Sequence, residues 1–466
     1  MICSNCGATL SEDSVFCNQC GTKVVQKPSF CEKCGNQLNI NDRFCGKCGN
    51  PVDGDTLVIV GADSTTSENT RQDELPDEEL DLAQIQSEAE QGNAIAQKRL
   101  GTLYYYGLIV SQDYSLAFDW YQKAALQGEP IAQMMLGDMY RLGDGVLIDY
   151  TKSAEWYQKA ADQGNAEAQF WLGLSYKIGR GVPENHKKAY EMMRKAAEQG
   201  LVDALFYLGK CYEEGIGVTQ NYSVAAEWYQ KAAEQENADA LYSLGHLYKN
   251  GLGVVQNDYK AAECFQAAAE KGDMYAQVTL GILYYNGSGV KQDYTKAAEW
   301  FQKAAEQGDY LSQYRLGMMY EDGEGVVQNY TKAVEWYRKA AAQGDADAQH
   351  ALGLMYDFGK GVEQNYYKAA EWYQKAAVQG HAGAQFNLGC LYHDGDGVSQ
   401  NYIKAAEWFK KAAEQGHAGA QLNLGLMYYT GDGVPQDDAL AKHWAQKAAT
   451  QGDAKAIKFL QSFIPL

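Results

Sequence analysis

Four Cys-x-x-Cys-Gly motifs near the start of the chain are the residues whose type and spacing most clearly imply chemistry. The first two motifs recur 28 residues later, which divides eight cysteines into two sets. The sets are Cys3, Cys6, Cys17 and Cys20, and then Cys31, Cys34, Cys45 and Cys48. Two residues between cysteines let one tight turn aim both thiolates at a single ion, and the following glycine permits that turn. The pattern predicts two closed, structural zinc sites, although four thiolates would also suit iron.

Each cysteine set spans a segment of only about 25 residues, which is too short to bury the apolar surface that folding requires. Metal binding would therefore supply most of the folding free energy of this region. Residues 1–50 resemble the double zinc-ribbon modules at the N-termini of many bacterial and archaeal multidomain proteins. The resemblance implies an adaptor that binds protein or, less often, nucleic acid.

The charge of the chain helps to choose between these partners. The formal net charge is −20, from 60 acidic and 40 basic residues, and it opposes the phosphate contacts that give most non-specific nucleic-acid affinity. Protein or peptide partners are therefore expected, and a nucleic-acid adaptor acting through the ribbons is the alternative. Residues 51–79 carry nine acidic residues against the single Arg71, a composition typical of a flexible tether. An acidic peptide that binds a basic partner is the second interpretation of this linker.

The cellular compartment is predicted from three features of the sequence. No run of about 18 apolar residues indicates a membrane span. The first ten residues lack the basic segment and apolar core of a secretory signal. Eleven cysteines, an odd number, argue against a disulfide framework. We expect a reduced, cytoplasmic protein that is not associated with a membrane.

The rest of the chain is built from one repeated segment. The dipeptide Leu-Gly recurs every 36 residues from Leu100 to Leu424, which defines ten units over residues 93–452. Strict periods of this length are typical of stacked supersecondary units, each of which needs its neighbours to bury its apolar face.

Each unit contains two expected helices that end at glycine. In the first, Ala96, Leu100 and Leu103 share one helical face, and in the second Trp120 and Tyr121 are expected to face inward. Asn or Asp opens several first helices, as an N-cap requires. Eight of the nine tryptophans occupy a single second-helix column, which predicts a packing role for them.

The pattern A-x-x-L-G-x-x-Y-x-x-G-x-G-V, followed by K-A-x-x-W-Y-x-K-A-A-x-x-G, closely resembles the Sel-one-like repeat family, a relative of tetratricopeptide repeats. The resemblance implies an all-α protein, an α/α-solenoid superhelix of ten 36-residue helix-turn-helix repeats preceded by the two small zinc ribbons. Partial or capping helices are expected at residues 80–92 and 453–463, so that the solenoid domain covers residues 80–466. It also implies a non-catalytic adaptor that holds partner proteins.

Other motifs in the array do not favour an enzyme. Glycine loops such as Gly143–Val146 follow a helix and lack the lysine of a P-loop, so helix capping explains them better. His381 and His417 occupy equivalent helix starts, and neither H-E-x-x-H nor a serine nucleophile elbow occurs. Some cysteine-rich members of the resembling family are linked to β-lactam binding or hydrolysis, but their disulfide pairs are missing here. We therefore expect no catalytic residues and no small-molecule substrate, with a β-lactam-hydrolysing enzyme as the least favoured alternative.

Partner binding is expected in the columns that the repeat does not fix, because fixed columns pack the units together. The first-helix positions equivalent to residues 95, 99, 102 and 106 form one such stripe, on the expected concave wall. In the early units it is apolar, and the candidate partner-binding residues are Met135, Leu142, Trp171, Leu174, Ile178 and Tyr207. Exposed apolar patches with Trp and Tyr mark interaction sites. The alternative is that these side chains pack locally between adjacent helices.

Overall fold

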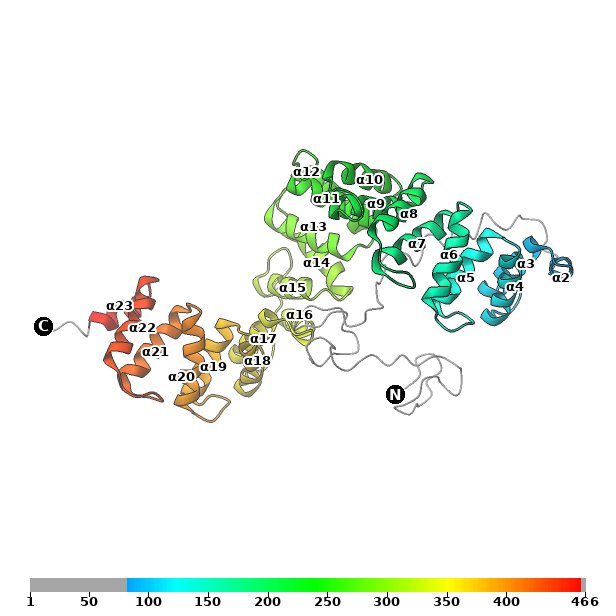
Figure 1. Ribbon diagram of the computed structural model, residues 1–466. Coiled ribbons are helices and arrows are strands. Elements are labelled where there is room, and N and C mark those ends of the chain that lie inside the picture. Colours follow the sequence, from blue (N-terminus) through cyan, green and yellow to red (C-terminus); the bar gives the residue numbers. More distant parts are fainter. Residues whose placement is uncertain (1–81, 462–466) are drawn as a thin grey trace. The chain divides into compact units, whose positions relative to one another are not determined.

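The computed structural model describes residues 82–461, and all regular secondary structure in this range is α-helical (Figure 1). The chain divides into two compact units, Met1–Glu79 and Leu80–Leu466. Both cysteine sets and the acidic linker lie outside the described residues, so the predictions made for them stay predictions. The described part is the predicted α-solenoid, whose ten repeats we number 1 to 10 from residue 93. None of its helices is both long and apolar enough to cross a membrane.

Every repeat consists of two helices of 13 residues each. The first helices are α3 (Ala94–Tyr106), α5 (Pro130–Leu142), α7 (Ala166–Ile178), α9 (Val202–Glu214), α11 (Ala238–Asn250), α13 (Met274–Asn286), α15 (Tyr310–Asp322), α17 (Ala346–Phe358), α19 (Ala382–Asp394) and α21 (Ala418–Thr430). The second helices are α4 (Tyr114–Leu126), α6 (Tyr150–Asp162), α8 (His186–Glu198), α10 (Tyr222–Glu234), α12 (Asp258–Glu270), α14 (Tyr294–Glu306), α16 (Tyr330–Ala342), α18 (Tyr366–Val378), α20 (Tyr402–Glu414) and α22 (Asp438–Thr450). Two shorter helices flank the array, α2 (Leu82–Glu90) and α23 (Ala454–Gln461).

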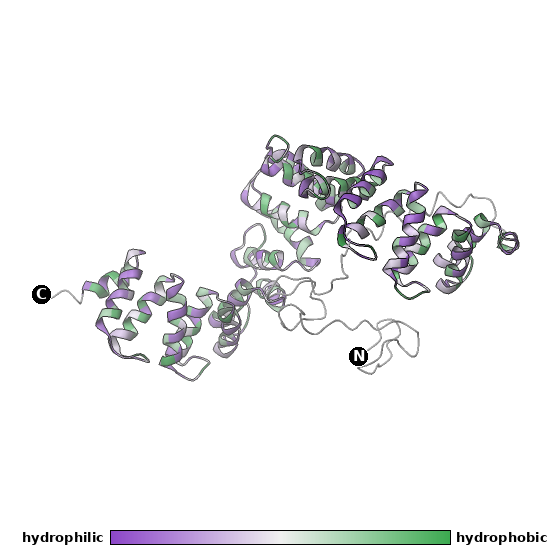
Figure 2. Ribbon diagram, in the orientation of Figure 1, coloured by the Kyte–Doolittle hydropathy of each residue, from purple (hydrophilic) through white to green (hydrophobic). Residues whose placement is uncertain are grey.

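Each helix packs on the helix before it and the helix after it in the chain. Hydrophobic and hydrophilic residues occur together on helices throughout the array (Figure 2), so a helix buries one side and exposes another. The stacking therefore follows the order of the sequence, as expected for a repeat protein in which each unit contacts only its neighbours.

The helix ends confirm the predicted capping chemistry. The side chain of Asn165 accepts a hydrogen bond from the backbone N–H of Ala168 at 2.8 Å. His381 and His417 use Nδ1 in the same way at the starts of α19 and α21. First helices end at a glycine in the left-handed region, such as Gly179 with φ 70°. The glycine loops are therefore caps and turns, which agrees with the interpretation that set aside a phosphate-binding loop.

The deepest core position in the repeat is an aromatic ring on the second helix, directly after the tryptophan column. The fully buried rings are Tyr121, Tyr157, Tyr229, Phe265, Phe301, Tyr337, Tyr373 and Phe409. Each ring lies against the glycine of the Leu-Gly pair in its own repeat. A Cβ atom added to Gly281 would lie 2.7 Å from the ring of Phe301, inside van der Waals contact. The glycine column therefore makes room for a ring, in addition to the close helix approach predicted from the sequence.

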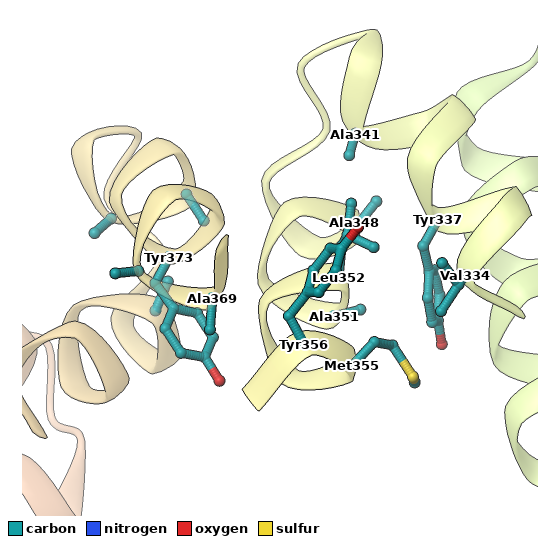
Figure 3. Packing of buried hydrophobic residues seen from close by; sticks show 14 of the residues in the cluster. Val334, Tyr337, Ala341, Ala348, Ala351, Leu352, Met355, Tyr356, Ala369 and Tyr373 are labelled. Carbon is teal, nitrogen blue, oxygen red and sulfur yellow. The ribbon is translucent and has the colours of Figure 1, made fainter. Parts of the chain in front are cut away.

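Neighbouring repeats share a continuous core, as the junction of repeats 7 and 8 shows (Figure 3). Here α17 lies between α16 and α18, with Tyr337 on one side and Tyr373 on the other. Leu352 and Met355 of α17 are buried in the same cluster. The apolar layer thus runs from one repeat into the next without a break at this junction.

The tryptophan column lies at the edge of this core and not inside it, which corrects the sequence prediction of a pure packing role. Seven of the eight tryptophans are half-buried, and Trp444 is 9% exposed. The lysine three residues later lies over each ring, with Nζ between 3.6 and 4.4 Å from a ring centroid. These pairs are Trp120 with Lys123, Trp156 with Lys159, Trp228 with Lys231, Trp300 with Lys303, Trp336 with Lys339, Trp372 with Lys375, Trp408 with Lys411 and Trp444 with Lys447. Each lysine covers an indole while its ammonium group stays close to water.

A ladder of buried glutamines joins the repeats through hydrogen bonds. Gln133 donates from Nε2 to the carbonyl oxygen of Ala125 in the preceding repeat (3.1 Å), and its Oε1 accepts from Gln163 (2.8 Å). The carbonyl group near the end of α4 thus gains a partner from the next repeat. The same buried position is occupied by Gln97, Gln169, Gln277, Gln313, Gln349, Gln385 and Gln421. Leu205 and Leu241 replace glutamine in repeats 4 and 5, so the ladder is interrupted there.

Replacing Gly281 by alanine should lower the free energy of unfolding by about 1–3 kcal/mol, because the added methyl group must displace the buried ring of Phe301. The matched control is Gly173→Ala, whose Cβ would first meet the flexible end of Met193 at 3.1 Å. Both variants gain the same helix propensity, so the difference between their free energies of unfolding measures the cost of displacing the ring of Phe301. Hydrogen exchange should locate the damage in α13, α14 and adjacent helices. A uniform loss of protection across all ten repeats would instead mean that the solenoid unfolds as one block.

Candidate protein-binding face

The six residues predicted to bind a partner lie in three different environments. Leu142 and Ile178 are exposed, by 48% and 37%, at the ends of α5 and α7. Trp171 and Tyr207 are half-buried on α7 and α9. The remaining two, Met135 and Leu174, are buried, with exposed fractions of 8% and 6%.

The expectation of a continuous exposed apolar stripe is therefore wrong at Met135 and Leu174. Met135 belongs to the core cluster of repeats 1 to 3, where it is buried alongside Met134 and Leu136. Burying an aliphatic side chain of this size is worth about 2 kcal/mol, which favours the core over solvent wherever apolar neighbours are within reach. The local packing that the sequence left open as an alternative applies to these two residues.

Trp171 is held in place by a cation from the neighbouring repeat. The guanidinium carbon of Arg141 on α5 lies 4.0 Å from the centroid of the Trp171 ring. Arg141 is itself fixed, because it donates to Asp138 at 2.8 Å and to the hydroxyl oxygen of Tyr157 at 3.1 Å. The hydroxyl group of Tyr157 donates in turn to Asp138 at 2.7 Å. These hydrogen bonds hold the guanidinium group of Arg141 in the orientation in which it lies over the indole of Trp171.

A longer contact between a cation and a ring lies one repeat later, around Tyr207. Nζ of Lys177 lies 5.8 Å from the centroid of the Tyr207 ring, and Lys177 occupies the position in its repeat that Arg141 occupies in the one before. Burial, with the nearby carboxylates of Asp239, Asp203 and Glu214 as smaller causes, raises the pKa of Tyr207 to about 12. The tyrosine hydroxyl group therefore stays neutral and able to donate a hydrogen bond across the physiological range.

Two buried phenylalanines hold these rings in register. Phe170 lies edge-on to Trp171 and to Tyr207, with ring centroids 5.4 Å apart in both contacts. Phe206 lies edge-on to Tyr207 at 5.3 Å. Phe170 and Phe206 are buried, so each of the two half-buried rings packs against a buried one. We call the accessible residues of this region the Trp171 face: Arg141, Leu142, Trp171, Lys177, Ile178 and Tyr207.

The alternation of ring and cation stops at repeat 5. Glu213 stands where Arg141 and Lys177 stand in their repeats, and Ser243 stands where Trp171 and Tyr207 do. Beyond this point carboxylates gather at the first-helix starts: burial, and then the charges of Asp273 and Asp203, raise the pKa of Asp239 to about 6. The paired ring and cation are therefore confined to repeats 2 to 4, and carboxylates lie at the starts of the first helices of repeats 4, 5 and 6: Asp203, Asp239 and Asp273.

The predicted zinc ligands cannot be placed, because all eight cysteines lie outside residues 82–461. Within that range, no three His, Cys, Asp or Glu side chains are grouped so that they could hold a metal ion. The three cysteines of the array, Cys211, Cys264 and Cys390, are free. Burial raises the pKa of each to about 11 or 12, so they are neutral thiols at physiological pH.

A cluster of histidines lies on the first-helix side of repeats 8 to 10. The rings of His350 and His381 lie against each other at a tilt of 32°, with centroids 4.4 Å apart, and Nε2 of His350 is 3.0 Å from Nδ2 of Asn387. His381 also lies 3.2 Å from Asp347. Burial, and then the charges of His381 and His417, lower the pKa of His350 to about 4. His350 is therefore a neutral packing residue, and its ring lies against that of Tyr373.

Sequence reasoning missed the cations and the phenylalanines of the Trp171 face. Arg141 and Lys177 are 30 residues before the rings they cover, so the pairing appears only when one repeat is compared with the next. Phe170 and Phe206 share a column with Tyr242, Tyr314 and Phe386. Aligning the ten repeats in register would have shown that Phe or Tyr occupies this column in five repeats and that glutamine occupies its column in eight.

Comparison with known families agrees with the fold. The model described as Sel1 repeat matches ten consecutive segments of the chain: 94–129, 130–165, 166–201, 202–237, 238–273, 275–309, 311–345, 346–381, 382–417 and 418–453. The chain belongs to the Sel1-repeat family. This Sel1-repeat protein also matches a family described as double zinc ribbon over residues 3–49, which include all eight clustered cysteines. No curated protein is a significant match to the chain.

Two crystal structures of bacterial repeat proteins are similar to this one. The first is c5321, a protective antigen of uropathogenic Escherichia coli with an SLR fold; it is 38% identical, covers 83% of this chain and 91% of its own, and has a TM-score of 0.59. The second is a Sel1 repeat protein from Oxalobacter formigenes; it is 36% identical, covers 66% of this chain and 90% of its own, and has a TM-score of 0.52. Both likenesses support the solenoid architecture.

The half-buried His350 of this Sel1-repeat protein should make its stability depend on pH. The pKa of His350 is about 4 in the folded state against 6.5 for a free histidine, so the folded state resists protonation. The stabilisation is present above about pH 6.5 and is lost as the pH falls toward 4. His350→Tyr, which places the residue of repeats 5 and 7 in repeat 8, should reduce the loss of unfolding free energy between pH 7 and pH 4 by up to about 3 kcal/mol.

Urea denaturation at several pH values measures this difference. The control is His443→Gln, which changes an exposed histidine beside Trp444 and should leave the pH dependence close to that of the unmodified protein. If His350→Tyr and the unmodified protein lost the same stability on acidification, the histidine would have no part in the effect.

Proposed function

We propose that this Sel1-repeat protein is a protein–protein interaction scaffold that binds a partner protein on the Trp171 face, on the concave side of its superhelix. Its N-terminal ribbons act as a second adaptor module with one structural zinc ion in each. The proposal rests mainly on one observation: Trp171 and Tyr207 remain partly exposed although both rings lie edge-on to buried phenylalanines and Arg141 lies over Trp171.

The chemistry of the Trp171 face supports binding of a protein rather than a small molecule. Trp, Tyr and Arg are the residues most enriched among those that dominate binding energy at protein interfaces. Rings that are already held in one orientation lose little conformational entropy when a partner docks. Leu142 and Ile178, exposed by 48% and 37%, add apolar contact area at the ends of the same helices.

The charge of the first-helix surface suggests how a long partner segment would be oriented. Its apolar part would contact the Trp171 face in repeats 2 to 4. Its polar or basic part would extend toward the first-helix starts of repeats 4 to 6, where burial, and then the charges of Asp273 and Asp203, raise the pKa of Asp239. A basic group bound there would relieve that repulsion.

The ribbons are proposed to fold around zinc in the cytoplasm, where thiols stay reduced. Support comes from the double zinc-ribbon match, which spans both sets of four cysteines. Four thiolates per ion complete a tetrahedral shell, so each zinc would be structural and would leave no open position for a substrate.

Trp171→Ala should weaken partner binding by about 2 kcal/mol or more, because it removes the largest anchor of the face. The experiment compares the proteins that copurify from the native cell with the full-length protein and with the variant, by quantitative mass spectrometry. A defined set of partners should disappear. Dissociation constants measured with one recovered partner then give the size of the effect.

Trp372→Ala is the matched control. Trp372 is also half-buried and also has a cation close to its ring, Lys375 at 3.8 Å, but it lies on a second helix. The two variants should lose similar amounts of stability, and the control should keep its partners. Equal loss of partners in both would assign the effect to unfolding and would reject the Trp171 face as the binding site.

Elemental analysis of the full-length protein, purified under reducing conditions, should find two zinc ions per chain. A strong chelator should remove them and unfold the ribbons, because metal binding supplies their folding free energy. The helical circular dichroism signal should change little, since the solenoid holds no predicted ligand. One ion per chain, none, or iron in place of zinc would contradict this assignment.

A further inference from the structure

A groove of about 860 Å³ lies at the boundary between repeats 5 and 6, on the side of the second helices. One wall is a single face of α12, which includes Glu263, Ala267 and Glu270. The other wall is formed by Val290 and by the residues that lead into α14. The volume falls in the range of about 300–1,000 Å³ that is typical of ligand sites.

The α12 wall departs from the repeat pattern at Ala267, because the equivalent residue is a lysine in the other nine repeats. These lysines are Lys123, Lys159, Lys195, Lys231, Lys303, Lys339, Lys375, Lys411 and Lys447. In repeat 6, for example, Lys303 stands four residues after Glu299 and three before Glu306, the spacing at which side chains on a helix are neighbours. Repeat 5 keeps both carboxylates but has the alanine between them.

The groups that hydrogen-bond to these two carboxylates are neutral. Nε2 of Gln266 donates to Glu270 at 2.9 Å, and the hydroxyl group of Tyr259 bonds to Glu263. The last turn of α12 has no basic residue. Glu263 and Glu270 are both exposed. The space over Ala267 therefore lies between two negative charges that a partner can reach.

The opposite wall carries positive charge. Lys291 and Lys296 are exposed, and Nζ of Lys296 lies 5.1 Å from the centroid of the Tyr284 ring. Asp293, the acidic residue of this wall, caps α14 by accepting from the backbone N–H of Lys296 at 3.0 Å. The buried residues Ala262 and Tyr284 also line the groove, which therefore combines apolar surface with two walls of opposite charge.

We propose that this groove is a second docking site, into which a partner protein inserts a lysine side chain over Ala267 and an adjacent acidic residue against the lysines of the opposite wall. The stem of the inserted lysine packs on Ala267 and Val290. Its ammonium group lies between Glu263 and Glu270, where it meets two opposite charges. The partner thus supplies the lysine that the other nine repeats have in their own sequence. The site lies on the second helices and does not involve the Trp171 face.

The test uses the full-length protein and the capped dipeptide acetyl-Lys-Glu-amide as the probe. Methyl NMR signals of Ala267 and Val290 report on the two walls. The dipeptide should shift both signals in a saturable manner, with a dissociation constant of the order of 1 mM. Three further probes each lack one part of it: acetyl-norleucyl-Glu-amide lacks the cation, acetyl-Lys-Gln-amide lacks the anion, and n-butylammonium is the lysine side chain alone. Each should bind at least about 3-fold more weakly.

The variants compare an empty position with a filled one. Ala267→Lys gives repeat 5 the lysine of the other repeats, so it should abolish the dipeptide-induced shift of Val290. Glu263→Gln with Glu270→Gln removes the two negative charges and should weaken binding at least about 3-fold. The matched control is Glu299→Gln with Glu306→Gln, the same change around Lys303 in repeat 6. It should leave binding unchanged, although it alters the net charge of the protein equally.

Four results would overturn the proposal. The first is the absence of a saturable shift at Val290 with acetyl-Lys-Glu-amide. The second is equal binding of the norleucine dipeptide, and the third is equal weakening by the two pairs of glutamine substitutions, which would assign the effect to the overall charge. Equal binding of n-butylammonium is the fourth, because it would make the groove a site for a small cation and not for a partner protein. If Ala267→Lys does not fold, the two glutamine variants decide.

Discussion

The array depends on the contact between one glycine and one buried aromatic ring, which is present in eight of the ten repeats. A ring such as Phe301 fills the space between two helices only because Gly281 has no side chain, since a Cβ would lie 2.7 Å from the ring. The contact fixes how the two helices of a repeat cross, before any neighbour is added. Stacking then needs only a constant second interface, which explains how ten repeats of 36 residues can follow one another without an insertion.

The second interface is unusual in being partly polar. Apolar layers between repeats, such as the one around Leu352, exclude water but do not by themselves fix the position of one helix along the next. The hydrogen bonds of the glutamine ladder do fix it, because each needs a particular donor and acceptor. Gln133 bonds at once to a backbone carbonyl of the preceding repeat and to Gln163, and a buried amide left without partners would cost about 1–3 kcal/mol. Repeats 4 and 5 lack these hydrogen bonds because Leu205 and Leu241 replace the glutamine. Repeat 4 also ends at Glu236, which adopts φ 64° where the other repeats have glycine.

The sequence was sufficient to predict the repeat length, both helices, their caps and the family, because each depends on residues close together in the chain. Burial was harder to predict. The tryptophan column looked like core from its regularity, yet Trp300 lies at the edge under Lys303 and the adjacent Phe301 is the buried ring. Adjacent residues on a helix differ by only about 100° in direction, so periodicity alone cannot tell which of the two is more deeply buried. Met135 and Leu174 were misjudged for the same reason.

The candidate sites have a common origin that explains why the sequence showed them only in part. Arg141 lies over a ring 30 residues later in the chain, and the groove beside α12 is lined by Ala267 of repeat 5 and by Tyr284 and Val290 of repeat 6, so both are formed across the boundary between two repeats. A substitution at a position that contacts only its own repeat destabilises the fold unless a second substitution in the same repeat compensates for it. A substitution at a position between two repeats instead alters the surface that both repeats form. Departures from the repeat pattern at such boundaries are therefore where a scaffold of nearly identical units can acquire a specific partner.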